Sequence, residues 1–418
     1  MRIAVDSAES ALFRARNAIF FTAVIAMNYT LSRPSPVDLI FILAFLVTLF
    51  VKQEVTPKFV TLVLLLTSWA VAYFFASVPY LGEKNVAFEL LAKSFAISLA
   101  LIGAAVTMSF DERNFLTYMR VYIVSCVIAS ILGTVGFALR IGLLTWDDRA
   151  KGLIDDPNMY GSFLIPAALF CVHLMHRPGA RRLWLAAALA IITVGILLSF
   201  SRIATVAFIL VTCLYVVFLH RLHLGRLVPV LLGLVGFGLL LFAIAYFSSA
   251  EFSEKFLQRL TFAESYDLGR EGRYGRYLLV LPMILDHPMG YGVLQLEKIF
   301  PEPIHNIWLS SFVNYGWLGG FTWIVLFFSS IGVCIQNYRK TRNPIPLVLM
   351  LSLIGIVMCA SLHEGEHWRH MWLAYGLVWG FNAAKFMPEP PRRAAPVPVM
   401  EEGPRVFRVA GLARAGEG

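Results

Sequence analysis

Twelve apolar runs, each long enough or nearly long enough to cross a membrane as a helix, dominate this sequence. A helix needs about 20 residues to cross about 30 Å of hydrocarbon. Strands are excluded for lipid-facing runs that do not alternate polar and apolar residues. The first two runs are short and could instead form a re-entrant hairpin. The predicted spans are 17–32, 37–51, 58–78, 86–110, 115–141, 158–176, 183–200, 203–219, 227–250, 307–335, 345–362 and 371–387.

The composition indicates that most of the protein surface faces membrane lipids. Hydrophobic residues make up 58% of the chain and charged residues only 15%, whereas soluble domains are closer to half apolar and a quarter charged. We therefore predict an all-α, polytopic membrane protein with one transmembrane domain over 1–387. The Pro-, Ala-, Gly- and Arg-rich residues 388–418 predict a disordered cytoplasmic tail. The N-terminus does not resemble a removable signal peptide.

Basic residues in the short loops predict the orientation. With twelve spans and a cytoplasmic N-terminus, all of these groups fall on the cytoplasmic side, and so does the C-terminus. The net charge of +9 is then the positive-inside bias and no sign of nucleic-acid binding. The groups are Arg14/Arg16, Lys52/Lys58, Arg177/Arg181/Arg182, Arg221/Arg226, Arg339/Lys340/Arg342 and Lys385/Arg392/Arg393.

The loops on the opposite, outer side hold the polar clusters of interest, over 147–158, 199–202, 251–306 and 363–370. Because these clusters share one face, we treat them as one candidate site. The outer face offers no nucleotides, and the sequence has no Walker loop or dinucleotide fingerprint. A transferase at that face therefore needs a lipid-linked donor.

Arginines are the first candidates for a ligand site. Arg270, Arg273 and Arg276 recur every third residue in the 251–306 loop, which we predict to be partly helical. They either anchor interfacial helices to the membrane surface or bind a diphosphate through guanidinium forks. Arg202, at the outer end of a helical hairpin, either snorkels to the surface or binds an anion.

Histidines supply the second set of candidates. His305, next to Asn306, opens the tenth span, and its imidazole could accept a proton from a sugar hydroxyl; a lone interfacial histidine is more often structural. His363 and His367 complete an H-E-x-x-H pattern, which is typical of zinc proteases when it lies on a helix. Gly365 interrupts such a helix, so an intramembrane zinc protease is a minor alternative.

Four segments in this order resemble the O-antigen ligase and polymerase superfamily of bacterial membrane enzymes. The resemblance covers about residues 140–335, and Tyr277 stands where many relatives have Trp. The segments are RAKGLIDDPNMYG, LLSFSRIA, GRYGRY followed by DHPMGYG, and HNIWLSSFVNYGWLGG.

The resemblance implies a GT-C-like glycosyltransferase in the bacterial inner membrane that needs neither a metal ion nor another cofactor. It would move an undecaprenyl-diphosphate-linked glycan at the periplasmic face, most simply onto lipid A–core. The alternatives are a polymerase, whose acceptor is a carrier-linked glycan, and a lipid-linked glycan flippase. The implied roles are diphosphate binding by Arg202 and by one or more of Arg273 and Arg276, and base or acceptor-orienting catalysis by His305. Further candidates to line the site are Arg270, Asn158, Asn306, His363, His367 and Arg369.

Overall fold

The computed structural model describes residues 2–32, 35–52, 55–220, 224–248, 253–254 and 272–387. Within these ranges each of the twelve predicted spans coincides with a helix. The helices are α1 (Arg2–Ala26), α2 (Pro36–Leu49), α3 (Pro57–Ser77), α4 (Val86–Thr107), α5 (Glu112–Ala138), α6 (Pro157–Met175), α7 (Arg182–Leu198), α8 (Arg202–His220), α9 (Leu224–Ser248), α12 (Ile307–Thr341), α13 (Ile345–Ala360) and α14 (Arg369–Gly380).

The all-α membrane architecture is confirmed. Six helices of the described ranges, α3, α4, α5, α6, α8 and α12, are long and apolar enough to cross a membrane, and α2, α7 and α13 are shorter apolar helices. The smaller elements are the amphipathic helix α11 (Arg273–Asp286), the 3-10 turns η1 (Val78–Tyr80), η2 (Gln295–Lys298), η3 (Gly365–His367) and η4 (Ala383–Phe386), and the two-residue strands β1 (Thr145–Trp146) and β2 (Arg149–Ala150).

Among the predicted spans, the first and the last differ most from their helices at the ends. The first helix begins at Arg2 and ends at Ala26, although 17–32 was expected. Its first turns contain helix-forming Ala, Arg, Glu and Leu that are not apolar enough for a hydropathy count. The last helix ends at Gly380, before the expected 387, and the chain continues through the extended Phe381 into η4.

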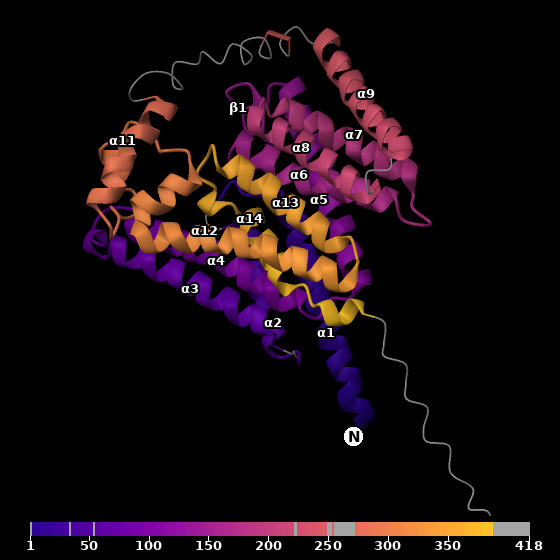
Figure 1. The fold of residues 1–418 in the computed structure, drawn as a ribbon, viewed down its shortest axis with the longest axis horizontal. Helices are drawn as coiled ribbons and strands as arrows, with labels where there is room; N and C mark the ends of the chain where they lie inside the picture. The colour runs from indigo at the N-terminus through magenta and orange to yellow at the C-terminus, as the bar shows by residue number, and fades with distance from the viewer. Residues whose placement is uncertain are drawn as a thin grey trace, which may run out of the picture. The chain divides into compact units, whose positions relative to one another are not determined.

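Helix α6 lies at the centre of the bundle and packs against α5, α7, α8 and α13. All of its residues are buried except Asn158 and Met175, whereas only 33% of the most apolar window is buried in α3 and in α8. Figure 1 shows α3, α4, α12 and α13 side by side. The first turn of α6 is thereby held at the middle of one end of the bundle, which fixes the position of Asn158.

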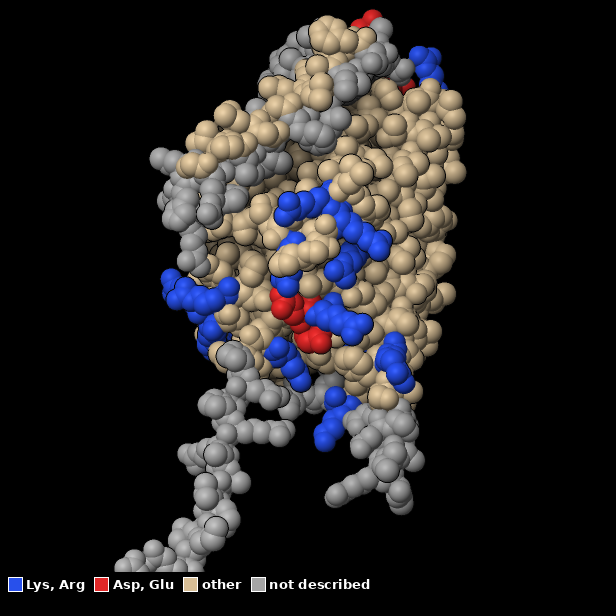
Figure 2. Space-filling model, turned by 90° about the vertical axis from the view of Figure 1, so that its right-hand side faces the viewer, with Lys and Arg blue, Asp and Glu red and all other residues tan. Residues whose placement is uncertain are grey.

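Lysine and arginine gather on one face of the protein (Figure 2). A shallow charged pocket combines Arg113, Arg120, Arg177 and Lys385 with Asp111 and Glu112. Arg177 follows the C-terminus of α6, and Asn158 lies in its first turn. A helix of 19 residues is about 28 Å long, so these two residues lie at opposite ends of the bundle, about one hydrocarbon thickness apart.

Helix α12 is broken at Gly316, whose φ of 69° and ψ of −172° are not helical. A break inside a membrane leaves backbone groups without partners, at a cost of several kcal/mol each. Here the turn at 287–292 supplies the partners. The amides of Tyr291 and Gly292 donate to the carbonyls of Val313 and Asn314, both at 2.8 Å, and the carbonyl of Pro288 accepts from the amide of Trp317 at 2.9 Å.

Candidate functional site

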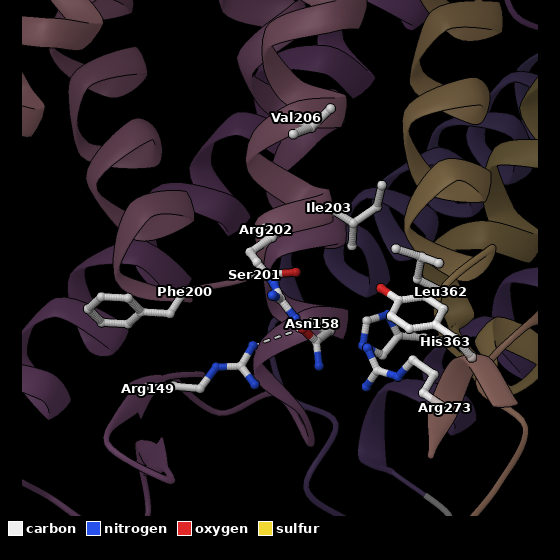
Figure 3. A pocket seen from close by; sticks show the side chains of 11 residues that line it. Arg149, Asn158, Phe200, Ser201, Arg202, Ile203, Val206, Arg273, Leu362 and His363 are labelled. Atoms are coloured by element: carbon white, nitrogen blue, oxygen red, sulfur yellow. Dashed lines mark hydrogen bonds between the residues drawn. The ribbon is translucent and has the colours of Figure 1, made fainter. Parts of the chain in front are cut away.

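One pocket collects polar residues from five separate parts of the chain (Figure 3). Its volume is about 230 Å³. Apolar side chains at Phe200, Ile203, Val206 and Leu362 form part of its wall. The polar lining residues are Arg149, Asn158, Ser201, Arg202, Arg273, Tyr274 and His363.

Three helix N-termini meet at this pocket. Asn158 belongs to the first turn of α6, Arg202 is the first residue of α8, and Arg273 is the first residue of α11. Helix N-termini carry partial positive charge and amide groups without intrahelical acceptors. None of the described lining residues is acidic. Three guanidinium groups and the N-termini of α8 and α11 therefore give the pocket a positive character that suits an anion.

Arg149 reaches the pocket from a tight β-hairpin. Strands β1 and β2 pair Trp146 with Arg149, and both intervening residues, Asp147 and Asp148, have positive φ (53° and 51°), as a type I′ turn requires. The Arg149 guanidinium donates to the carbonyl of Ser199 and to Oδ1 of Asn158, each at 2.8 Å. We did not predict Arg149 as a site residue. The Asp-Asp pair was the available signal, because aspartate tolerates the left-handed region.

The start of α6 explains the polar segment before it. Asp156 accepts hydrogen bonds from the amides of Asn158 (2.7 Å) and Met159 (3.0 Å), and Pro157 occupies the first helical position. The Asp-Pro pair is thus a helix start. Gly161 has a packing role, since a Cβ there would lie 2.8 Å from Cβ of Ala204 and 3.0 Å from Oγ of Ser199. Its absence lets the α7–α8 turn approach α6 and bring Arg202 close to Asn158.

Arg202 begins α8 directly after the tight α7–α8 turn. Phe200 in this turn has a φ of 48°, and the amide of Ser201 donates to Oγ of Ser199 at 3.2 Å. In Figure 3, Arg149 and Arg202 approach Asn158 from one side, and Arg273 and His363 lie on the other. The structure thus brings together Asn158, Arg202, Arg273 and His363, which the sequence had placed in four different loops or loop ends.

Arg276 does not line the pocket. Its side chain is 1% exposed and donates to the carbonyls of Glu302 and Pro303, the latter at 2.8 Å, and to Oε2 of Glu302 at 3.1 Å. These contacts do not support the predicted contact with a diphosphate. They make Arg276 a clamp that ties α11 to the segment before His305. Arg270 lies outside the described residues.

Arg276→Met should lower the thermal stability of the protein, because two buried carbonyls would lose their donor at about 1–3 kcal/mol each. Its effect on binding of undecaprenyl diphosphate should be smaller than that of Arg273→Met, since only Arg273 lines the pocket. Thermal midpoints and binding isotherms of the two variants provide the comparison. Equal losses of affinity in Arg276→Met and Arg273→Met would indicate that Arg276 also contacts the diphosphate.

His305 and Asn306 lie beside the pocket, at the start of α12. The Asn306 side chain caps the helix, accepting from the amides of Trp308 (3.0 Å) and Leu309 (3.1 Å). His305 has a φ of 53°, and its carbonyl accepts from the hydroxyl of Tyr277 at 3.1 Å. Its ring lies 6.0 Å from that of His363, measured between centroids. His305 thus lies next to His363, which lines the pocket, but His305 itself is not part of the lining.

The HEGEH segment does not form an α-helical turn. Only Gly365–His367 is helical, as a 3-10 turn. His363 lines the pocket, while His367 lines a second, mostly apolar cavity together with Arg369. Arg369 makes two bonds to the carboxylate of Asp38, at 2.6 and 2.7 Å. The two histidines therefore lack the shared helical face on which zinc proteases depend.

A buried network fixes this segment in place. The carboxylate of Glu366 accepts from Lys93 at 2.6 Å, from Ser310 at 2.9 Å and from the hydroxyl of Tyr315. Trp308 Nε1 also donates to Oγ of Ser361 at 2.8 Å. Helices α4, α12 and α13 thus hold the loop that carries His363. Among the described residues no group of three or more His, Cys, Asp or Glu could hold a metal ion.

The charge of the pocket acts on His363. Burial, then the positive charge of Arg273 and His305, lower the pKa of His363 to about 3. Its imidazole is therefore neutral at physiological pH. Burial contributes most to this shift, and the nearby positive charges of Arg273 and His305 lower the pKa further.

A family model confirms part of the resemblance. Residues 186–324 match the model described as O-antigen ligase (Wzy_C). This segment is similar to the O-antigen ligase family. The matched segment runs from α7 into α12 and includes Arg202, Arg273 and His305, but Arg149, Asn158 and His363 come from outside it. It supports transfer of the ligase or polymerase type in general. No match was found among curated proteins.

Proposed function

We propose that this protein transfers a glycan from undecaprenyl diphosphate to an acceptor hydroxyl, with lipid A–core as the favoured acceptor. The observation that carries the proposal is the convergence of Arg149, Arg202 and Arg273 with the N-termini of α8 and α11 in one pocket. Guanidinium forks match phosphate oxygens and keep their charge. They would stabilise the negative charge that develops on the diphosphate as the sugar–phosphate bond breaks.

Orientation follows from the two ends of the bundle. We propose that the basic face of Figure 2 is cytoplasmic, by the positive-inside rule. The pocket, at the other end of α6, then faces the periplasm of the bacterial inner membrane, where a lipid-linked donor is available. Met1–Phe386 form one compact unit, which we take as the catalytic domain. Residues 388–418, outside the described ranges, would form a cytoplasmic tail.

The experiment uses purified protein with a chelator present, undecaprenyl-diphosphate-linked glycan as donor and lipid A–core as the only added acceptor. A lipopolysaccharide ladder would support the ligase. Glycan growth on the carrier lipid, with lipid A–core unchanged, would identify a polymerase that uses the same pocket. Absence of both products, with and without the chelator, would contradict glycan transfer. Activity that appears only without the chelator would contradict the arginine-based mechanism.

His305→Asn should reduce transfer at least about tenfold and leave expression and membrane insertion intact. Asparagine tolerates the left-handed backbone of this position but lacks the imidazole ring, so either proton acceptance or orientation of a neighbouring group by His305 would be lost. Initial transfer rates measure the loss of activity, and the yield of monodisperse protein shows whether folding and insertion are intact. A variant with wild-type turnover would show that His305 has no part in the reaction.

A further inference from the structure

The pocket lining has many hydrogen-bond donors and few hydrogen-bond acceptors. A glycan-accepting hydroxyl must lose its proton during transfer, so one group near the pocket has to take up that proton. Arginine side chains only donate hydrogen bonds. Oδ1 of Asn158 already accepts from Arg149. Ser201 and Tyr274 offer hydroxyl groups, which are weak bases near neutral pH. Among the described lining residues, His363 alone has a side chain able to take up a proton in this range.

The hydrogen bonding of His363 sets its tautomer. Its Nδ1 lies 3.2 Å from the carbonyl oxygen of Cys359. A ring nitrogen that faces a carbonyl carries the proton, so Nε2 is the acceptor of the neutral ring. Trp308, bonded to Ser361 two residues earlier, and the Glu366 network hold the backbone on both sides. His363 is thus both anchored and in the correct protonation state to act as a base.

We propose that His363 is a catalytic residue of the transfer and that its Nε2 receives the proton of the acceptor hydroxyl. The proposal rests on the proposed function. The acceptor oxygen forms a bond to the anomeric carbon of the donor sugar, and the bond from that carbon to the phosphate oxygen breaks. The electron pair leaves with undecaprenyl diphosphate, and the hydroxyl proton moves to His363. His305, whose ring lies 6.0 Å away, then serves as a positioning residue behind it.

The donor itself would activate this base. Positive charge from Arg273, His305 and Arg149 contributes to the low pKa of His363. A diphosphate bound between Arg149 and Arg273 offsets that charge and stabilises the imidazolium, so the pKa of His363 rises when the donor is present. Proton uptake is therefore favoured only in the complex in which a proton has to be removed.

Glu364 is the neighbouring alternative, and its geometry argues against it. Burial, then the negative charge of Glu366, raise the pKa of the Glu364 carboxyl, which accepts a hydrogen bond from the backbone of Ile304. Glu364 is absent from the pocket lining. It supports the segment that leads to His305, and it offers the acceptor no direct contact.

The test compares His363→Ala and His363→Gln with His176→Ala. His176 is a matched control, because its Nδ1 also bonds to the carbonyl four residues earlier (2.8 Å from Val172) after the C-terminus of a helix, at the opposite end of the bundle. The measurements are the initial rate of transfer from undecaprenyl-diphosphate-linked glycan to whichever acceptor the wild type uses, and the Kd for undecaprenyl diphosphate.

We expect His363→Ala and His363→Gln to lose at least about 100-fold in rate, a larger loss than in His305→Asn, with little change in Kd. Glutamine keeps a hydrogen-bond acceptor but takes up no proton. His176→Ala should retain full activity. Near-wild-type rates in either His363 variant, or a Kd that weakens as much as the rate falls, would overturn the assignment. Wild-type protein that transfers nothing would contradict the proposed function itself.

Discussion

Arg202→Lys should lower glycan transfer about 100-fold, although it preserves the charge. Removing one preorganised donor from a developing oxyanion costs about 10²–10³ in rate, and an ammonium cannot reproduce the planar fork of a guanidinium. Arg202 is the first residue of α8, and it points toward Asn158 beside Arg149 (Figure 3). The ammonium of lysine reaches less far than the guanidinium of Arg202, so some phosphate oxygens would lose their hydrogen-bond donors.

The control for this variant is Arg120→Lys, in the charged pocket at the opposite end of the bundle. Transfer rates of the two variants and their affinities for undecaprenyl diphosphate provide the measurement. We expect the control to match the wild type in both. Normal turnover in Arg202→Lys would mean that Arg202 only anchors the end of α8 at the membrane surface.

Gly290→Ala should prevent the protein from folding to its native state. The backbone of Gly290 has a φ of 79°, and a Cβ there would lie 2.4 Å from the amide nitrogen of Gly316 and 2.6 Å from the carbonyl oxygen of Asn314. Both contacts are with backbone that cannot move without opening the bonds across the break in α12. The combined strain should exceed about 4 kcal/mol, the range of the most damaging single substitutions.

Gly142→Ala is the matched control, because nothing lies within 4 Å of a Cβ built at Gly142. The yield of monodisperse protein and its thermal midpoint distinguish the two variants. If Gly290→Ala purified with a wild-type midpoint, the turn at 287–292 would not be essential to α12.

Hydropathy predicted the twelve helices well because it reports which residues lipid surrounds. It carries no information on which helix ends meet. The meeting of Asn158, Arg202 and Arg273 depends on the central position of α6 and on close packing at Gly161, which only the structure shows. Charge spacing could not tell two arginines of one helix apart: Arg273 lines the pocket, whereas Arg276 donates to backbone carbonyls.

Histidine patterns were the hardest to interpret from sequence. His363 was one of several possible lining residues, and the HEGEH pattern drew attention to metal chemistry. Its position became clear only when the 3-10 turn separated His363 from His367 and placed each at a different cavity. The hairpin that presents Arg149 was missed, because two residues per strand produce no periodic pattern for a sequence to reveal.

The charge of the pocket comes from groups that do not titrate under ordinary conditions. Arginine keeps its proton at any pH a bacterium meets, and the partial charge of a helix N-terminus belongs to the peptide backbone. On the periplasmic side that we propose for it, the pocket would meet the acidity of the surroundings without the buffering of the cytoplasm. A site assembled from Arg149, Arg202, Arg273 and two helix ends would hold its lipid-linked donor equally well in acidic and alkaline surroundings.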